Sequence, residues 1–570
     1  MQRARLLARL LASPICLLAI SAAGLSALVW AENQTATVPF ALSIVVATMS
    51  IAYVISGRIA FSVYCGWSIM GLVALISVSK FKLKGFSLHF YDFVFVARDA
   101  DIYDFLIGEY TFLFMSLLSI LVVGVVVLTL IWRDTERRAS SLRARLLPTL
   151  AAGVALPLSF PAEAAQNRYF YYLAGRHASA FFISLLDIEH LIADGSGLAR
   201  LADHEPQPPF DPTPRCRREA GQPDVHVILQ ESRPNLSDFP QLAGNWAEMD
   251  RARGLSAPIH PLQVETFGGG TWISNLSVMT GLSTADFGWR SPYLTITLNK
   301  KVRGALPAVM AACGYRTVAI LPMKHGFVNE GPFLESIGFQ TVLDATAIGS
   351  EGLGHRDHTY FDAAERFIAE HRRTDGRPLF LLVQTLFAHG PYHQRLARDV
   401  RLADEPVHGD KELSEYLRRL SIARSDFLAF MDVRRQQRDQ RPSVVLEFGD
   451  HHAAPMLGPI EKVTGDAALA NLNSLAYRTY FSIHGFGHRV DRQVSLPTRL
   501  DIGFLPTVLI QKAGLPTSAM FEDLASVRDT CDGRFYTCER REIVDRHLRK
   551  RIDSGLLDVL RPGLRAEGEG

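Results

Sequence analysis

The pattern of hydrophobic and polar positions divides the chain into two parts. Between residues 5 and 162, apolar residues form about five long stretches, and roughly 20 such residues cross the hydrocarbon core of a bilayer. From about residue 224 onward, short β-type runs such as DVHVILQ and SVVLEFG alternate with amphipathic helical patterns such as HTYFDAAERFIAEHRR. This alternation predicts an α/β domain with helices on both faces of a mostly parallel sheet.

The apolar stretches predict an amino-terminal bundle of about five transmembrane helices. The last of them is short and contains Pro148 and Pro157. Arginines precede the first and the last stretch, so the positive-inside rule places both of these sites in the cytoplasm, and an odd number of crossings exports the rest of the chain. Lys80, Lys82 and Lys84 oppose this rule, and the segment after them reads either as interfacial or as a connecting loop. The predicted spans are about 8–30, 37–56, 59–79, 110–132 and 146–161.

Composition between the two parts sets the predicted boundaries. An aromatic patch, RYFYYL, and the Pro-rich segment EPQPPFDPTPR separate them, and such prolines are typical of a spacer. The small-residue sequence PAEAA also resembles a signal-peptide cleavage site, so release of the second part near Ala164 is an alternative. The prediction is a transmembrane domain over 1–162, an interfacial helix and linker over 163–221, an α/β domain over 222–517 and a charged carboxyl-terminal extension over 518–570.

Charge and cysteine content exclude some classes of partner. The 570 residues carry a formal net charge of only +2, so the chain has no large positive field that would imply a nucleic-acid partner. None of the six cysteines forms a CxxC pair or a zinc-finger spacing. Cys531 and Cys538 flank a short loop, and they either form a disulfide in an oxidising compartment or remain two thiols.

Polar side chains follow three of the predicted strands. Glu231 follows DVHVILQ, His389 follows PLFLLVQTLF, and Asp450 and His451 follow SVVLEFG. Ligands of open α/β sheets gather at the carboxyl ends of parallel strands, so these residues are expected to share a pocket. Thr271 comes directly after three glycines at the start of a predicted helix, where free N–H groups favour a phosphate.

These residue types favour a metal-activated nucleophile. A threonine hydroxyl is scarcely ionised at neutral pH, so it needs a base or a cation that stabilises its alkoxide. With Glu231, Asp450 and His451, Thr271 forms a mixed nitrogen and oxygen ligand set that suits Zn²⁺ or Mn²⁺, with Mg²⁺ a weaker match. Each residue also has a structural alternative, as a helix cap, an ion-pair partner or a loop residue.

The order of these motifs resembles the exported domain of lipoteichoic acid synthases and of the phosphoglycerol transferases of periplasmic glucans, which belong to the alkaline phosphatase and sulfatase superfamily. The segments KLKGFSLHFYDF and DIGFLPTVLIQKAG resemble the same family. The resemblance implies a multi-pass protein of the bacterial inner membrane whose catalytic domain faces the periplasm or the cell exterior. It also implies that Glu231, Thr271, Asp450 and His451 bind one divalent metal and that Thr271 is the nucleophile.

The resemblance extends to histidines around the site. His389 would contact the substrate phosphate or assist proton transfer, and His325 would line the pocket. His393 and His452 are further imidazoles for a substrate contact or a second metal, although histidines that face solvent are the commoner outcome.

One stretch departs from the family pattern. In the synthases, a Trp and an Arg of an F-W-N-R segment hold the glycerol phosphate. Here FVNE at 327–330 places Val328 and Glu330 at those positions, with Asn329 between them as a substrate-binding candidate. A carboxylate at this position would repel a phosphate, because both are negatively charged, but it would pair with an ammonium group such as that of ethanolamine.

These observations together predict a membrane-anchored transferase. It would move a phospholipid head group, phosphoglycerol or phosphoethanolamine, through a phosphothreonine at Thr271 to an envelope glycan or glycolipid. A sulfatase would need a cysteine or serine in a C/S-x-P-x-R context, whereas WISNL follows Thr271. A hydrolase with water as the acceptor shares every residue and stays open, and a non-enzymatic scaffold is the third alternative.

Overall fold

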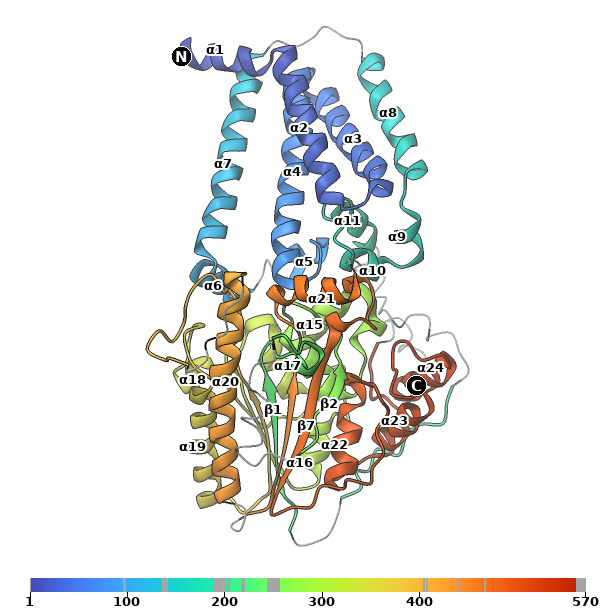
Figure 1. The fold of residues 1–570 in the computed structure, drawn as a ribbon. Coiled ribbons are helices and arrows are strands. Elements are labelled where there is room, and N and C mark those ends of the chain that lie inside the picture. The colour runs from blue at the N-terminus through green and yellow to red at the C-terminus, as the bar shows by residue number, and fades with distance from the viewer. Residues whose placement is uncertain are drawn as a thin grey trace. The chain divides into compact units, whose positions relative to one another are not determined.

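The structure is a computed structural model (Figure 1). It describes residues 2–95, 99–135, 142–188, 198, 201, 206–216, 221–242, 257–402, 405, 409–437, 441–465 and 468–559. The chain forms two compact units. The helical unit comprises Met1–Ala97 and Tyr110–Glu189, and the sheet unit comprises Arg98–Glu109 and His190–Gly570. Helix α6 (Ala100–Glu109) therefore belongs to the sheet unit, although it falls inside the predicted transmembrane domain 1–162.

The helical unit contains four helices that are long and apolar enough to cross a membrane, counted over the described part of the chain. Helix α8 (Leu142–Leu158), where a fifth span is expected, has 17 residues and contains both Pro148 and Pro157. Residues 136–141 of the basic run before it lie outside the described residues. The fifth crossing therefore stays a prediction. The four candidate spans are Pro14–Glu32, Thr35–Ser56, Ile59–Lys84 and Thr111–Asp134.

The sheet unit is built on one mixed sheet of eight strands. Their order is β4-β3-β5-β1-β6-β7-β2-β8, and every neighbouring pair is parallel except the two that β7 forms. The mostly parallel sheet is thus confirmed, whereas the antiparallel β7 was not foreseen. The strands are β1 (Asp224–Gln230), β2 (His260–Gln263), β3 (Arg316–Ile320), β4 (Thr341–Leu343), β5 (Leu379–Gln384), β6 (Ser443–Gly449), β7 (Arg478–Phe486) and β8 (Leu500–Asp501).

Helices cover both faces of this sheet (Figure 1). The central strands β1, β5 and β6 are buried along their whole length, which explains their continuous apolar sequences. Apolar side chains of α19 and α20, including Phe361, Phe427 and Phe430, pack against β5 in one core cluster. The main helices of this unit are α14 (Thr271–Thr280), α16 (Leu306–Ala312), α17 (Glu330–Ser336), α19 (His358–Thr374), α20 (Lys411–Gln436), α22 (Leu505–Ala513), α23 (Ala519–Thr530) and α24 (Arg541–Asp553).

Two disulfides link segments of the sheet unit. Cys531 and Cys538 form a bridge, which was one of the two alternatives left open by the sequence, and a second bridge joins Cys216 to Cys313 across 97 residues. The charged tail predicted at the carboxyl terminus forms α24, and one of its faces is buried: the Arg551 side chain is fully enclosed and donates to the carbonyl of Gly281. The carboxyl-terminal segment through α24 therefore belongs to the core of the sheet unit.

Candidate active site

Two neighbouring strands place acidic residues side by side. β1 and β6 are parallel, and their last paired residues are Gln230 and Gly449. Glu231 and Asp450 follow directly, so both carboxylates emerge at the same edge of the sheet, as expected for parallel strands. Both side chains are almost completely buried, at 2% and 0% exposure.

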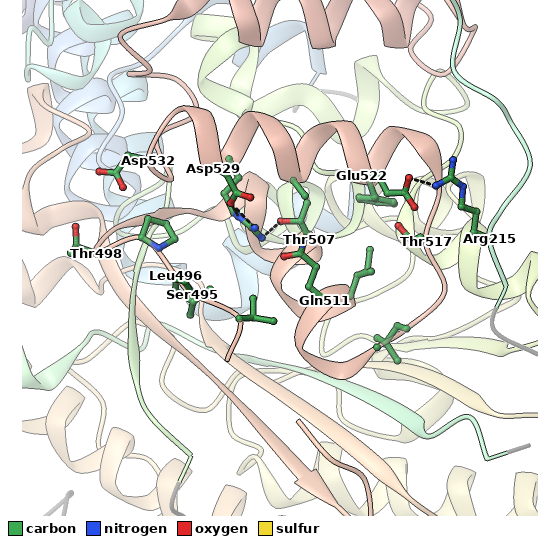
Figure 2. Close-up of a pocket in the computed structure, with 18 of the residues that line it drawn as sticks. Arg215, Ser495, Leu496, Thr498, Thr507, Gln511, Thr517, Glu522, Asp529 and Asp532 are labelled. Carbon is green, nitrogen blue, oxygen red and sulfur yellow. Dashed lines mark hydrogen bonds and ion pairs between the residues drawn. The ribbon is translucent and has the colours of Figure 1, made fainter. Parts of the chain in front are cut away.

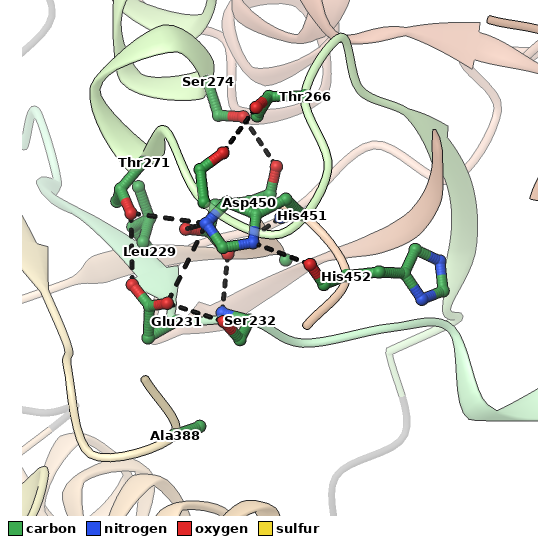
Figure 3. A network of polar contacts seen from close by, with 12 residues as sticks. Leu229, Glu231, Ser232, Thr266, Thr271, Ser274, Ala388, Asp450, His451 and His452 are labelled. Atoms are coloured by element: carbon green, nitrogen blue, oxygen red, sulfur yellow. Dashed lines mark hydrogen bonds and ion pairs between the residues drawn. The ribbon is translucent and has the colours of Figure 1, made fainter. Parts of the chain in front are cut away.

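A glycine loop brings Thr271 to this edge. Gly268, Gly269 and Gly270 all have positive φ angles, of 73°, 156° and 91°, which L-residues with a Cβ rarely adopt. A Cβ on Gly270 would also lie 2.9 Å from the Thr266 side chain. Helix α14 therefore begins at Thr271. The Thr271 hydroxyl donates a hydrogen bond of 3.1 Å to Glu231 Oε2 (Figure 3).

His451 completes the cluster, and its tautomer is set by its backbone neighbour. Nδ1 lies 3.0 Å from the carbonyl of His452, and a carbonyl only accepts, so Nδ1 carries the proton. The lone pair of Nε2 then faces the site. Nε2 lies 3.5 Å from the Thr271 hydroxyl, 3.8 Å from Glu231 Oε1 and 3.2 Å from Asp450 Oδ2. A metal-binding histidine has this arrangement, because its other ring nitrogen is held by an acceptor.

The electrostatics of the cluster favour a bound cation. Burial raises the pKa of Glu231 to about 8, and the neighbouring Asp450 adds to this effect. Burial likewise raises the pKa of Asp450 to about 7. Two enclosed carboxylates hold negative charge at neutral pH only when a positive charge compensates them.

The donor atoms fit such a cation. Ligand atoms of Glu231, Asp450 and His451 all lie within 4.8 Å of one another. Asp450 Oδ1 accepts two backbone N–H groups, those of Ser232 and His451, whereas the buried Oδ2 has no hydrogen-bond donor. A buried carboxylate oxygen without a donor is costly, and a divalent metal would satisfy it. The residues present therefore match the mixed ligand set expected from the sequence.

His389 lies beside an aromatic wall that includes an unexpected element. Its Nδ1 lies 2.6 Å from the carbonyl of Gly390. Its ring lies 6.0 Å from the ring of Phe105, which in turn lies 5.6 Å from that of Phe327. Phe105 belongs to helix α6 (Ala100–Glu109), the short segment that packs with the sheet unit. In the sequence this segment lies between two predicted spans, so nothing local marked it as part of the site.

Helix α6 is also anchored to the FVNE segment. Asp99 Oδ2 accepts the backbone N–H of Val328 at 2.9 Å, and Asp104 forms an ion pair with Lys324 at 2.9 Å. Val328 and Asn329 both have positive φ angles, of 47° and 58°, a strained conformation for non-glycine residues. The Asp99 bond therefore fixes this tight turn.

The structure buries Glu330 rather than exposing it. The residue is 6% exposed, and its Oε1 accepts hydrogen bonds from Asn275 at 2.9 Å and from Gln384 at 2.8 Å. Asn275 lies four residues after Thr271 on α14, hence on the same helix face. Burial raises the pKa of Glu330 above its usual value. Asn329 beside it donates to the carbonyl of Thr295.

Three predicted histidines do not join the cluster. His325 is partly exposed and contacts Glu335 at 3.0 Å. His393 is exposed and lies near Gln394. The His452 ring is buried but points away from Thr271 (Figure 3) and donates to the carbonyl of Arg478. Among the described residues, the group of possible metal ligands consists of Glu231, Asp450 and His451, and neither His393 nor His452 belongs to it.

Two residues that position the site were not predicted from the sequence, Ser232 and Arg419. Ser232 adopts a positive φ of 52°, which turns its N–H to Asp450, and its hydroxyl donates to Glu231 Oε1 at 2.6 Å. Arg419 of α20 is fully buried and donates to the carbonyls of His389, Pro391 and Gln394. Its place in an amphipathic helix gave no signal, because its partners lie in a distant loop.

Comparison with known proteins finds one family model and several relatives. Residues 264–472 match the family model named Sulfatase, and this range contains Thr271, His389, Asp450 and His451. An uncharacterised protein of Haemophilus influenzae is 26% identical over 314 residues, which are 53% of this chain and 55% of that protein. A putative cyclic beta-1,2-glucan modification protein of Rhizobium meliloti is 24% identical over 274 residues, 46% of this chain and 41% of that protein. The chain therefore spans about half the length of these curated relatives.

A solved membrane protein shares the fold over most of both chains. The integral membrane protein lipooligosaccharide phosphoethanolamine transferase A (EptA) of Neisseria meningitidis is 12% identical, with a TM-score of 0.51. The match covers 84% of this chain and 94% of EptA. At this identity the likeness shows the fold alone.

Proposed function

The chain carries a sulfatase-family domain over residues 264–472, and from this premise we propose that the protein is a metal-dependent transferase of a phosphorylated lipid head group. One observation carries the proposal: the Thr271 hydroxyl lies at the start of α14, bonded to Glu231 and beside the buried Asp450 and His451. The free N–H groups of the first turn of α14 favour an anion at the same place.

In the first half of the proposed reaction, Thr271 Oγ1 attacks the phosphorus of a phospholipid head group. A bond forms between that oxygen and phosphorus, and the bond from phosphorus to diacylglycerol breaks. The proton lost by the threonine is balanced by the one that the diacylglycerol oxygen gains. His389, whose ring lies beside that of Phe105, is our candidate to hold the phosphate or to move this proton.

In the second half, a hydroxyl oxygen of the acceptor attacks the same phosphorus, and the bond between phosphorus and Thr271 Oγ1 breaks. The proton that the acceptor hydroxyl loses is balanced by the one that Thr271 Oγ1 regains. Two displacements of this kind imply ping-pong kinetics. Glu231, Asp450, His451 and Thr271 would hold one Zn²⁺ or Mn²⁺, which when bound stabilises negative charge on the attacking and leaving oxygens. We propose a glycan or glycolipid as the acceptor, in keeping with the name of the Rhizobium meliloti relative.

The buried Glu330 supports a cationic head group such as ethanolamine. Its hydrogen-bond donors are the neutral amides of Asn275 and Gln384, so an incoming ammonium group would supply a charge partner for the carboxylate. If so, Glu330→Gln shifts the donor preference from phosphatidylethanolamine toward phosphatidylglycerol. An unchanged preference would exclude this role.

We further propose that the sheet unit lies outside the cytoplasmic membrane. Both disulfides lie in this unit, and disulfides persist in oxidising compartments. This placement requires α8 to be a fifth crossing if the amino terminus is cytoplasmic. A membrane-impermeant protease added to spheroplasts should cleave the sheet unit, whereas protection of the unit would refute the topology.

Intact mass measurement tests the central proposal. The purified full-length protein is incubated with phosphatidylethanolamine or phosphatidylglycerol in Zn²⁺ or Mn²⁺, and a glycan is then added. We expect a covalent adduct whose mass identifies the head group. The Thr271→Ala variant should form no adduct, whereas Thr297→Ala, which replaces a threonine outside the cluster, should still form it. An adduct on the Thr271→Ala protein, or none with any lipid and metal, would refute the proposal. Loss of the adduct at equal rates with and without glycan would identify a hydrolase instead.

A further inference from the structure

A second cavity lies at the end of the sheet opposite Thr271. It has a volume of about 1070 Å³. Phe486, at the end of β7, lines it and pairs with Ser443 at the start of β6, whereas Asp450 follows the end of β6. Seven residues of strand separate the two places by about 20 Å. A molecule in this cavity therefore does not touch the atoms that react at Thr271.

The cavity is strongly cationic. Arg435, Arg489, Arg492 and Lys512 line it, and Asp491 is the single carboxylate among its described lining residues. The whole chain has 60 basic and 58 acidic residues, so this excess is local and does not follow from composition.

Two of these cations have no acidic partner. Arg489 and Arg492 are exposed, and neither forms an ion pair with any carboxylate that the structure describes. Asp491 lies between them in the sequence, but its Oδ1 accepts the backbone N–H of Gln493 at 2.8 Å. Lys512 is 8% exposed, and its ammonium donates only to backbone carbonyls, at 3.2 Å and 3.4 Å. Arg435 pairs with Asp432 at 2.8 Å, so the unpaired positive charge of the cavity is that of Arg489 and Arg492.

The adjoining cavity provides an internal comparison (Figure 2). It has a volume of about 1110 Å³ and shares the segment 494–498 with the cationic cavity. There Arg215 pairs with Glu522, and Arg528 pairs with Asp529 at 2.6 Å. Cations in the neighbouring cavity are thus matched by carboxylates, so unmatched arginines are a specific property of the cavity around Arg489 and Arg492.

We propose that the cationic cavity binds an anionic oligosaccharide, one that carries phosphate, sulfate or carboxylate groups. Arginine forks match the geometry of such groups, and His260 and His488 add ring edges that suit sugar hydroxyls. Cavities of 300–1000 Å³ hold drug-sized ligands, so this one accommodates several sugar residues. A membrane surface is a poorer match, because no described lining residue is an exposed large apolar side chain, and interfacial binding needs such side chains.

This binding does not depend on the proposed transfer reaction, and its test is a binding measurement. The full-length protein in detergent is titrated against a fluorescent sulfated hexasaccharide, the same hexasaccharide without sulfate, and phosphatidylglycerol vesicles. The test variant combines Arg489→Gln with Arg492→Gln. The control combines Arg366→Gln with Arg546→Gln, which removes the same charge from exposed helix positions outside both cavities.

We expect the test variant to bind the sulfated probe about tenfold more weakly, as the loss of two ion pairs implies, and the control to change it less than twofold. The unsulfated probe should bind neither protein. Thr271→Ala should bind like the wild type, so failure of the transfer reaction is distinguishable from failure of this site. Equal weakening in both double variants, equal binding of the unsulfated probe, or no binding to the wild type would overturn the proposal. Vesicle binding that only the test variant loses would identify a membrane surface instead.

Discussion

We expect the bridge between Cys216 and Cys313 to stabilise the sheet unit about twice as much as the bridge between Cys531 and Cys538. A disulfide acts mainly by restricting the unfolded chain, and the effect grows with the logarithm of the loop that it closes. The first bridge closes a loop of 97 residues and the second a loop of 7. The loop-entropy relation gives about 4.7 kcal/mol for the long loop and about 2.4 kcal/mol for the short one.

The assay compares two double variants, each with one cysteine pair replaced by serine. The full-length protein in detergent is equilibrated in urea and exposed briefly to a protease, so that cleavage of the sheet unit reports its unfolded fraction. The free energy of unfolding follows from linear extrapolation to zero urea. Wild-type protein under reducing conditions, which opens both bridges, is the control.

The difference between the two variants is the decisive quantity. If loop entropy governs stability, replacing Cys216 and Cys313 lowers the free energy of unfolding by about 2 kcal/mol more than replacing Cys531 and Cys538. Equal losses, or a greater loss from the short loop, would refute this reasoning. They would show that local packing around Cys531 and Cys538 dominates instead.

Other buried groups give predictions of their own. Glu447→Gln leaves Arg424 enclosed without its carboxylate partner, so we expect a loss of about 3–5 kcal/mol in the free energy of unfolding; a loss below about 1 kcal/mol would argue against this. Burial alone would raise the pKa of Glu447, but Arg424 and its other partners hold this pKa below the usual range. The stabilisation that the Glu447 carboxylate gives to the folded state is therefore fully present above about pH 4.3. It disappears as the pH falls toward the folded-state pKa. Urea unfolding across pH should therefore show wild type and Glu447→Gln converging in acid. Arg419→Lys removes a guanidinium that donates to three loop carbonyls. We therefore expect the free energy of unfolding of the sheet unit to fall by about 2–3 kcal/mol and turnover to fall as well. Unchanged turnover would show that the loop of His389 does not need this support. Phe105→Ala removes the ring beside His389 and should raise KM for the lipid several-fold with a smaller change in kcat, whereas unchanged kinetics would exclude α6 from the substrate wall.

The core of the site could be predicted because its signals are local. Glu231, Asp450 and His451 each follow a continuous apolar run, and that run identifies a buried parallel strand and its carboxyl end. Thr271 follows three consecutive glycines, and such a run indicates a tight loop with positive φ angles before the helix. Strand ends and helix starts depend mainly on neighbouring residues, so these positions could be predicted without knowing the tertiary fold.

Features that depend on distant segments could not be predicted. The Cys216–Cys313 bridge joins residues 97 positions apart, and the side-chain directions of His393 and His452 depend on loops whose course no periodicity specifies. The reversed direction of β7 depends on packing against β6 and β2. Helix α6 lies between apolar stretches, which favoured its assignment to the membrane part, although its contacts place it with the sheet unit.

The discontinuity of the sheet unit has a consequence for its biogenesis. Helix α6 leaves the ribosome more than one hundred residues before β1, an interval of roughly ten seconds at ~10 residues per second. A helix of 10 residues is not stable alone in water, so α6 acquires its structure only when Val328 and Phe327 have been made and can receive it. The wall beside His389 therefore forms only after that point in synthesis, and a chain cut between α6 and β1 would have to rejoin its two fragments before this wall is complete.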